Sequence, residues 1–534
     1  MADPWWKSAV LYQIYPRSFQ DSDADGIGDL RGIIERLPYL VELGVDALWL
    51  SPIFASPMAD FGYDISDYTA VDPLFGSLAD FDALLREAHA VGLKVLLDFV
   101  PNHTSAEHPW FRESRASRDG PKRDWYIWRD GALGGGPPNN WLSEFGGSAW
   151  TYDDPAGQYY YHAFLAAQPD LNWRNPAVRA AMHDVMRFWL GRGVDGFRID
   201  VIWHLIKDDQ FRDNPPNSDF FAGDPPHRRQ LPLYSADRPE VHELVRELRS
   251  VVDEFPERLL IGEIYLPLDR LVKYYGRDLA GVHLPFNFSL LETPWDARAV
   301  ARLIDRYEAL LPEGAWPNWV LGNHDRPRVA SRIGQAQARV AAILLLTLRG
   351  TPTLYYGDEI GLPQVAIPAD RVQDPFEKNV PGLGRDGCRT PMQWGAGAFA
   401  VFSEVSPWLP LAENFAGNNV ACQGADPASL LNLYRRLIGL RRRRPALRRG
   451  AYRPLQAVGD VLAYFRETED DRLLVALNFD GGQAALTIPS PGTVMLSSSG
   501  DRAGEDVVYS LTLRPHEGVI VALGLGRTEP TSAN

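Results

Sequence analysis

An arginine and an aspartate stand together at the end of a short apolar run. In Gly196–Val201, the side chains of Arg198 and Asp200 fall on the same face, because alternate residues of a strand point the same way. A guanidinium beside Asp200 lowers its pKa and favours the ionised form that a carboxylate nucleophile needs. An isolated Arg-x-Asp pair is also typical of an ordinary ion pair, so the interpretation depends on its neighbours.

Three other apolar runs also end in carboxylates, histidines or asparagines. The first run ends with Asp98, Asn102 and His103, the second with Glu263, and the third with Asn323, His324 and Asp325. Two carboxylates, one ionised and one protonated, are what the cleavage of a glycosidic bond requires. In that scheme Asp200 is the nucleophile and Glu263 is the acid/base, with a pKa raised by burial. Asp325 would bind hydroxyls and stabilise positive charge on the sugar. His103 and His324 would donate hydrogen bonds to hydroxyls or to Asp200.

Other chemistries fit these residues less well. There is no Ser-His-Asp arrangement and no cysteine with a nearby base, which argues against acyl transfer. Two histidines with carboxylates are also compatible with a metal site. However, the chain has no H-E-x-x-H or His-x-His pair, and Arg198 beside Asp200 would repel a divalent ion.

The apolar runs and the amphipathic stretches between them predict eight strand-then-helix units. The predicted strands are Val10–Tyr15, Ala47–Pro52, Lys94–Phe99, Gly196–Val201, Leu259–Ile264, Val282–Phe288, Trp319–Leu321 and Thr353–Tyr356. The predicted helices include Leu30–Leu43, Leu78–Ala90, Pro176–Leu190 and Arg238–Phe255. No Gly-rich phosphate loop follows the first strand, so a (β/α)8 TIM barrel is favoured over an open α/β sheet. The strand ends then converge on one face.

Two segments interrupt the barrel pattern and one follows it. We expect a catalytic barrel over residues 1–103 and 174–450, with an inserted subdomain over 104–173 after the third strand. A second irregular insertion, Lys207–Tyr234, follows the fourth strand. Residues 451–534 carry alternating strands without a catalytic-looking cluster, so we expect an antiparallel β domain there. Its predicted strands are Val461–Arg466, Arg472–Asn478, Ala484–Ile488, Thr493–Leu496, Val507–Leu513 and Gly518–Leu523.

Composition restricts the partners and the compartment. The 54 basic and 69 acidic residues give a net charge of −15, which disfavours nucleic acid and anionic membranes. The N-terminus lacks the apolar region of a signal peptide, and no apolar stretch is long enough to span a bilayer. The two cysteines provide no disulfide framework. We expect a cytoplasmic enzyme, a monomer or a homodimer, acting on a small neutral substrate.

Four sequence blocks resemble the signature regions of the α-amylase family (glycoside hydrolase family 13), in the family's order. They are Asp98–His103, Gly196–Val201, Gly262-Glu263 and Asn323–Asp325. Further motifs resemble the branch that contains α-glucosidases and oligo-1,6-glucosidases, namely Tyr12–Phe19, Gly62–Ile65, Gln168–Trp173 and Arg389–Trp394. The resemblance covers nearly the whole chain and is weakest over Lys207–Tyr234 and the C-terminal β domain.

This resemblance implies further roles. Asp60 and Arg389 match residues that close the non-reducing end of a glucose pocket, which makes an enzyme exo-acting on short chains. Tyr63 matches the aromatic platform under the first sugar. The inserted subdomain of the family forms one wall of the sugar pocket, and the residues that match this wall are Phe145, Phe164 and Gln168.

An acidic segment precedes the first barrel helix. Carboxylates alternate along Asp21–Asp29 with a glycine in mid-loop, which is the pattern of a Ca²⁺ loop, although a solvated acidic turn has the same composition. A match to a family metal site strengthens the calcium interpretation, and Mg²⁺ stays open. The candidate ligands are Asp21, Asp23, Asp25, the carbonyl of Ile27, and Asp29. Such a site would be structural.

The sequence does not decide which glycosidic linkage is cleaved. Val201, next to the nucleophile, matches members that cleave α-1,6 bonds, but the following Ile202–Leu205 departs from the usual oligo-1,6-glucosidase run. We therefore favour a general α-glucosidase on maltose-type substrates, with transglucosylation and an oligo-1,6-glucosidase as alternatives. A non-catalytic relative such as the transporter-associated heavy chains is disfavoured, because those proteins carry a membrane span and lose the catalytic residues.

Overall fold

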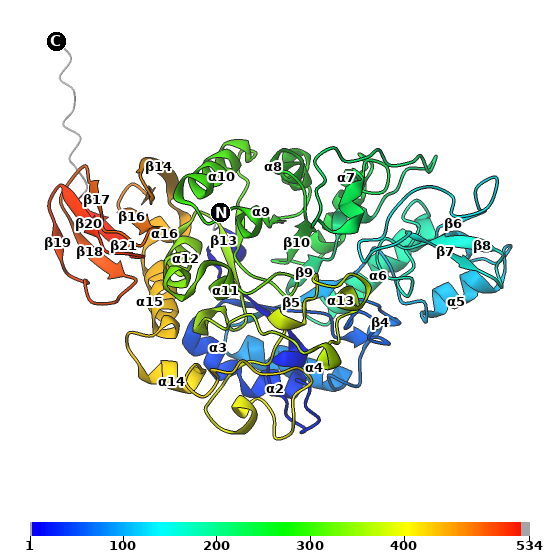
Figure 1. Cartoon of the computed structure of the whole chain (residues 1–534), viewed down its shortest axis with the longest axis horizontal. Helices are drawn as coiled ribbons and strands as arrows, with labels where there is room; N and C mark the ends of the chain where they lie inside the picture. Colours follow the sequence, from blue (N-terminus) through cyan, green and yellow to red (C-terminus); the bar gives the residue numbers. More distant parts are fainter. Residues whose placement is uncertain (1–2, 525–534) are drawn as a thin grey trace, which may run out of the picture.

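A parallel barrel forms the centre of the molecule (Figure 1). The structure, a computed structural model, describes residues 3–524 apart from the side chains of residues 456–458. Eight strands pair in parallel in the order β11-β10-β9-β5-β2-β1-β13-β12, and β11 contacts β12 across the remaining gap. They are β1 (Leu11–Ile14), β2 (Ala47–Leu50), β5 (Lys94–Phe99), β9 (Gly196–Ile199), β10 (Leu259–Ile264), β11 (Leu284–Asn287), β12 (Asn318–Val320) and β13 (Thr351–Tyr355). Each overlaps a predicted strand, and the TIM barrel is confirmed.

Both faces of the barrel strands are buried, which explains their nearly continuous apolar sequences. In β2, Ala47 and Trp49 belong to the cluster inside the barrel, whereas Leu48 and Leu50 belong to the larger cluster under the helices. The same alternation places the polar Arg198 of β9 inside. Its guanidinium carbon lies 5.0 Å from the centre of the Trp49 ring.

The helices outside the barrel follow the predicted pattern with one difference. The helices α4 (Leu78–Ala90), α6 (Pro176–Gly191) and α7 (Val241–Asp253) correspond to predicted segments. The expected helix Leu30–Leu43 is instead two helices, α2 (Leu30–Glu35) and α3 (Leu37–Leu43). The break falls at Arg36, because Pro38 lies in the first turn of α3, the part of a helix that tolerates proline.

The segment between β5 and α6 forms a small unit of its own at one end of the barrel (Figure 1). It contains α5 (Pro109–Ala116) and a three-stranded antiparallel sheet of β6 (Trp128–Arg129), β8 (Gln158–Tyr161) and β7 (Trp150–Asp153). The segment Lys207–Tyr234 after β9 has only the short 3-10 helix η4 (Pro226–Arg229). Both segments approach the carboxyl ends of the barrel strands.

An antiparallel sheet follows the barrel and packs on its outer helices, on the side opposite β6–β8 (Figure 1). Its order is β14-β15-β16-β21-β18-β19, and β17 pairs with β20 beside it. The sequence missed β14 (Ala451–Val458), and the single strand expected over Val507–Leu513 is divided into β19 (Asp506–Val507) and β20 (Ser510–Leu513). Tyr509, with φ of 58°, interrupts it. The other members are β15 (Val461–Glu467), β16 (Arg472–Asn478), β17 (Ala484–Thr487), β18 (Gly492–Ser497) and β21 (Gly518–Leu523). Within residues 3–524, no helix has the length and apolar character needed to cross a bilayer.

Candidate active site

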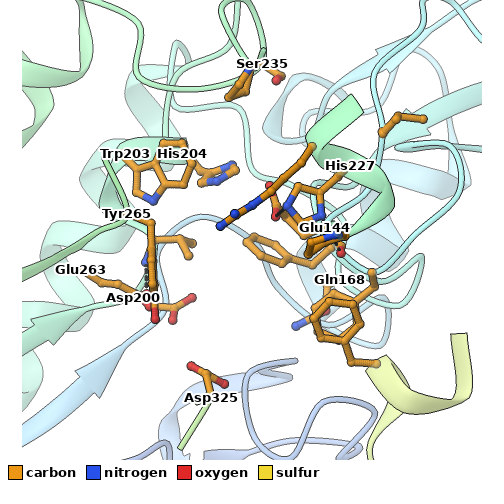
Figure 2. A pocket seen from close by; sticks show the side chains of 18 of the residues that line it. Glu144, Gln168, Asp200, Trp203, His204, His227, Ser235, Glu263, Tyr265 and Asp325 are labelled. Atoms are coloured by element: carbon orange, nitrogen blue, oxygen red, sulfur yellow. Dashed lines mark hydrogen bonds and ion pairs between the residues drawn. The ribbon is translucent and has the colours of Figure 1, made fainter. Parts of the chain in front are cut away.

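A cavity of about 580 Å³ opens at the carboxyl ends of the barrel strands. Residues at or just after the ends of β9, β10 and β12 bring the carboxylates of Asp200, Glu263 and Asp325 to it, and Figure 2 shows Asp200 between the other two. The segments after β5 and β9 supply most of the remaining lining, including Glu144, Phe145, Phe164, Gln168, Trp203, His204, His227 and Arg228. Of the predicted strand-end residues, five line this cavity, namely His103, Asp200, Glu263, His324 and Asp325. Asp98, Asn102 and Asn323 do not line it.

Arg198 is the centre of a buried charge cluster. Its Nη1 donates hydrogen bonds to Asp98 Oδ1 and to Asp200 Oδ1, both at 2.8 Å. Its Nη2 lies 2.8 Å from Glu263 Oε2. Three carboxyl groups thus surround one guanidinium that is itself fully buried. Because one positive charge cannot balance three buried negative charges, part of this cluster must bind protons.

The pKa values of this cluster follow from that imbalance. Burial and the charge of Glu263 raise the pKa of Asp200 well above its usual range, although Arg198 opposes this. Burial also raises the pKa of Glu263, and it raises that of Asp98 to about 6. The expectation that Arg198 keeps the pKa of Asp200 low is wrong for the unliganded site, because Arg198 is shared. Asp200 and Glu263 titrate as a coupled pair, because each negative charge disfavours the other.

Asp325 has the opposite electrostatic environment. Although burial disfavours its charge, His324, Arg385 and Arg389 hold the pKa of Asp325 well below its usual range. Arg389 Nη2 donates to Asp325 Oδ1 at 2.9 Å, and Arg385 Nη1 donates to the same oxygen at 3.3 Å. The cavity therefore presents one carboxylate that stays ionised and a pair of carboxyl groups whose pKa values are raised.

His324 and Tyr63 link the two sides of the cavity through hydrogen bonds. Gln13 Nε2 donates to His324 Nδ1 at 2.7 Å, so the hydrogen of the imidazole is on Nε2. That nitrogen lies 2.6 Å from the Tyr63 hydroxyl, which donates to Asp98 Oδ2 at 3.0 Å. Burial lowers the pKa of His324 to about 3, so the imidazole is neutral near neutral pH. The Tyr63 ring stacks on His324 with an interplanar angle of 4°.

The far end of the cavity is closed by polar side chains. Arg385 Nη2 donates to Asp60 Oδ1 at 2.6 Å, and Gln168 Nε2 donates to Asp60 Oδ2 at 3.3 Å. His103 lies beside them, with its Nε2 3.1 Å from the carbonyl oxygen of Tyr63. Burial lowers the pKa of His103 to about 4, so it too is uncharged. This end can bind hydroxyl groups through both donors and acceptors.

Two aromatic residues of the inserted segment lie beside this polar end of the cavity. The ring centres of Phe145 and Phe164 lie 6.2 Å apart in an edge-to-face arrangement. Phe164 also lies 5.1 Å from the His103 ring, again between ring centres. Both side chains line the cavity. They provide apolar surface beside the polar end formed by Asp60.

Arg389 does not have the position expected from the sequence. It is fully buried behind the cavity, where its Nε donates to the carbonyl oxygen of His324 at 2.7 Å. Arg385 lines the cavity instead and also donates to Asp374 Oδ1 at 2.7 Å. Arg385, and not Arg389, therefore has the place at the cavity that the sequence interpretation gave to Arg389. The resemblance indicated the right segment but the wrong arginine, four residues along the chain.

A charged pair in the outer wall was missed by the sequence interpretation. Glu144 Oε2 lies 2.9 Å from His227 Nε2, and His227 Nδ1 lies 3.1 Å from the Glu144 carbonyl oxygen. Burial opposes charge on both, but their mutual attraction lowers the pKa of Glu144 to about 2 and raises that of His227. The pair joins the inserted segment to the segment after β9 within one wall of the cavity (Figure 2).

The acidic loop before α2 brings three of its five candidate ligands together. Oxygens of Asp21, Asp23 and Asp29 lie within 4.8 Å of one another. Asp25 Oδ1 accepts a hydrogen bond from the Ile27 backbone N–H at 2.7 Å. Asp21 and Asp29 also accept backbone N–H groups, which fixes their orientation. The donor set of three carboxylates suits a hard cation such as Ca²⁺.

Comparison with known proteins gives a consistent result. The family model described as alpha amylase, catalytic domain, matches residues 13–450. A probable alpha-glucosidase of Rhizobium meliloti (strain 1021) is 44% identical over 91% of each chain. The oligo-1,6-glucosidase of Heyndrickxia coagulans is 37% identical over 97% of this chain and 99% of its own.

Solved structures agree over nearly the full length. The alpha-glucosyl transfer enzyme XgtA is 43% identical with a TM-score of 0.94, over 98% of this chain and 100% of its own. The trehalulose synthase MutB from Pseudomonas mesoacidophila MX-45 is 35% identical with a TM-score of 0.90 and the same coverage. Both the family model and these full-length matches show that the chain belongs to the α-amylase family of glycoside hydrolases.

Proposed function

We propose that this protein is a retaining, exo-acting α-glucosidase that releases glucose from the non-reducing end of short α-glucosides. The observation that carries the proposal is the contact of Asp200 and Glu263 with the same guanidinium, that of Arg198. Two carboxyl groups on one guanidinium suit the ~5–5.5 Å separation of retaining enzymes, whereas inverting enzymes need about 6.5–9.5 Å.

In this mechanism Glu263 is protonated when substrate is bound, and Asp200 is ionised. Asp200 attacks the anomeric carbon while Glu263 protonates the departing oxygen, which gives a covalent glucosyl-enzyme. Glu263 then removes a proton from water, which displaces Asp200. Asp325, held ionised by Arg385 and Arg389, stabilises positive charge on the ring in both steps.

The polar end of the cavity supports exo action. Asp60, Arg385 and Gln168 would bind the hydroxyls of the terminal glucose and leave no passage for a longer chain beyond it. A sugar acceptor in place of water would give transglucosylation. That alternative is supported by the similarity to the glucosyl transfer enzyme and the trehalulose synthase.

The bond preference can be tested directly. The similarity to a probable alpha-glucosidase is higher than that to an oligo-1,6-glucosidase, so we expect maltose to be the better substrate. Kinetics on maltose, isomaltose and sucrose, with the anomer of the product followed by NMR, test this. Release of β-glucose, or wild-type protein inert on all three and on p-nitrophenyl α-glucoside, would contradict the proposal.

We further propose that the acidic loop binds a structural Ca²⁺ through Asp21, Asp23, Asp25, the carbonyl of Ile27, and Asp29. This is supported by the oxygens of Asp21, Asp23 and Asp29, which lie within 4.8 Å of one another. The charges of Asp25, Asp29 and Asp21, together with burial, raise the pKa of Asp23, so a cation would relieve repulsion in the unliganded loop. Chelation should lower the melting temperature, and added Ca²⁺ should restore it. The Asp23→Asn variant should lose this response, while a matched Asp67→Asn change on β4 (Asp67–Val71) should keep it. The expected location and oligomeric state stay predictions.

A further inference from the structure

Val201 has a backbone conformation that a valine rarely adopts. Its φ is 36° and its ψ is 44°, in the left-handed region that β-branched residues avoid. The chain is fixed on both sides of it. Asp200 N–H donates to the Phe99 carbonyl oxygen at 2.8 Å, and His204 N–H donates to the Val201 carbonyl oxygen at 2.8 Å. Strain that the surroundings impose in this way is found mainly where the backbone has a task.

The conformation directs the Val201 amide at Glu263. The N–H of Val201 donates to Glu263 Oε2 at 2.8 Å. The same oxygen lies 2.8 Å from Arg198 Nη2. An oxygen that faces an N–H donor and a guanidinium has no favourable place for a proton of its own. The proton of the neutral Glu263 must therefore be on Oε1.

We propose that Val201 is a positioning residue whose strained backbone amide fixes the acid/base Glu263 with its transferable proton on Oε1. The inference rests on the proposed glucosidase function and deepens it. As the bond between the anomeric carbon and the leaving oxygen breaks, its electron pair stays on that oxygen, which takes the proton from Oε1. Asp200 forms the new bond to carbon. In the second step Oε1 takes a proton from the attacking water, and the bond to Asp200 breaks.

The hydrogen bond from the Val201 N–H also affects the pKa of Glu263. This bond favours the carboxylate form of Glu263, so removing the N–H should raise the pKa of Glu263. A leaving group that departs without protonation should be less sensitive to this change. Nitrophenolate is such a group, whereas the glucose released from maltose needs the proton.

The test is an amide-to-ester exchange at residue 201. Suppression of a stop codon with α-hydroxyisovaleric acid replaces the Val201 N–H by oxygen and keeps the side chain, and suppression with valine is the control. We expect kcat/KM on maltose to fall about tenfold or more relative to the valine control. The kcat/KM on p-nitrophenyl α-glucoside should fall less. In the pH dependence of kcat/KM on maltose, the alkaline limb should move to higher pH.

Equal losses on both substrates with an unmoved alkaline limb would overturn the proposal, as would full activity of the ester protein. Failure of the glucosidase proposal itself would differ, since the valine control would then be inert. A second pair of variants tests the backbone strain. Val201→Gly should melt at a higher temperature than Val201→Ala, because only glycine adopts this conformation without cost. The opposite order would contradict the strained conformation.

Discussion

The two sides of the cavity are built in different ways. The floor, defined as Asp98, Arg198, Asp200 and Glu263, comes from three neighbouring barrel strands and their ends. The wall, which includes Glu144, His204, His227 and Arg228, comes from the segments after β5 and β9. Floor side chains are almost completely buried, whereas the paired side chains of Glu144 and His227 keep 29% and 20% exposure.

This difference separates the residues that carry out the reaction from those that select the substrate. Sheet hydrogen bonds hold the floor in register, since Asp98 pairs with Arg198 between β5 and β9, and Ile261 pairs with Arg198 between β10 and β9. The wall depends on side-chain contacts between two irregular segments. We infer that the floor carries the reaction common to the family, and that the wall decides which leaving group or acceptor is accepted.

The largest effect should come from the floor. Asp200→Asn removes the nucleophile but retains its shape, so we expect kcat to fall by about 10⁴-fold or more on every substrate. The measurement is glucose release from maltose and nitrophenol release from its α-glucoside, with circular dichroism to verify folding. A folded variant that keeps a tenth of the activity would show that Asp200 is not the nucleophile.

A smaller effect should distinguish the two arginines that surround Asp325. Arg385→Lys alters the cavity end around Asp60, so we expect kcat/KM to fall about 10²-fold, mainly through KM. Arg389→Lys removes the buried hydrogen bond to the His324 carbonyl oxygen and weakens the contact with Asp325, so we expect a lower melting temperature and a lower kcat with little change in KM. Kinetics and melting curves on both variants test this. If Arg389→Lys raised KM more than Arg385→Lys, the reassignment of the sugar-binding arginine would be wrong.

The same contrast explains what the sequence could predict. Strand periodicity located Asp200 and Glu263, because residues at the ends of parallel strands must meet at one end of the barrel. No periodicity relates Glu144 to His227, which are 83 residues apart in irregular segments. The pKa of Asp200 could not be predicted either, since it depends on how many carboxylates share Arg198. The single helix predicted over Leu30–Leu43 is divided because Pro38 begins a new helix, a consequence that the amphipathic pattern alone did not show.

The smallest effect should come from the wall and should depend on pH. The raised pKa of His227 means that its contribution is complete below about pH 6.5 and is lost as the pH rises through the folded value. The lowered pKa of Glu144 means that its contribution is complete above about pH 4.5 and is lost as the pH falls towards 2. The pair should therefore stabilise the protein most between about pH 4.5 and 6.5, by ~1 kcal/mol or less because both side chains are partly exposed.

This pH range allows the contribution of the wall to be tested without changing any residue of the floor. The Glu144→Gln/His227→Gln double variant should melt below the wild type at pH 5.5, and the difference should shrink by pH 8.5. Hydrolysis of p-nitrophenyl α-glucoside should stay within about threefold, whereas the ratio of maltose to isomaltose hydrolysis should move, because only the disaccharides place a second sugar against the wall. A melting difference independent of pH would indicate lost packing alone. An unchanged disaccharide ratio would assign acceptor selection to other residues of the cavity, such as Val201 at the edge of the floor.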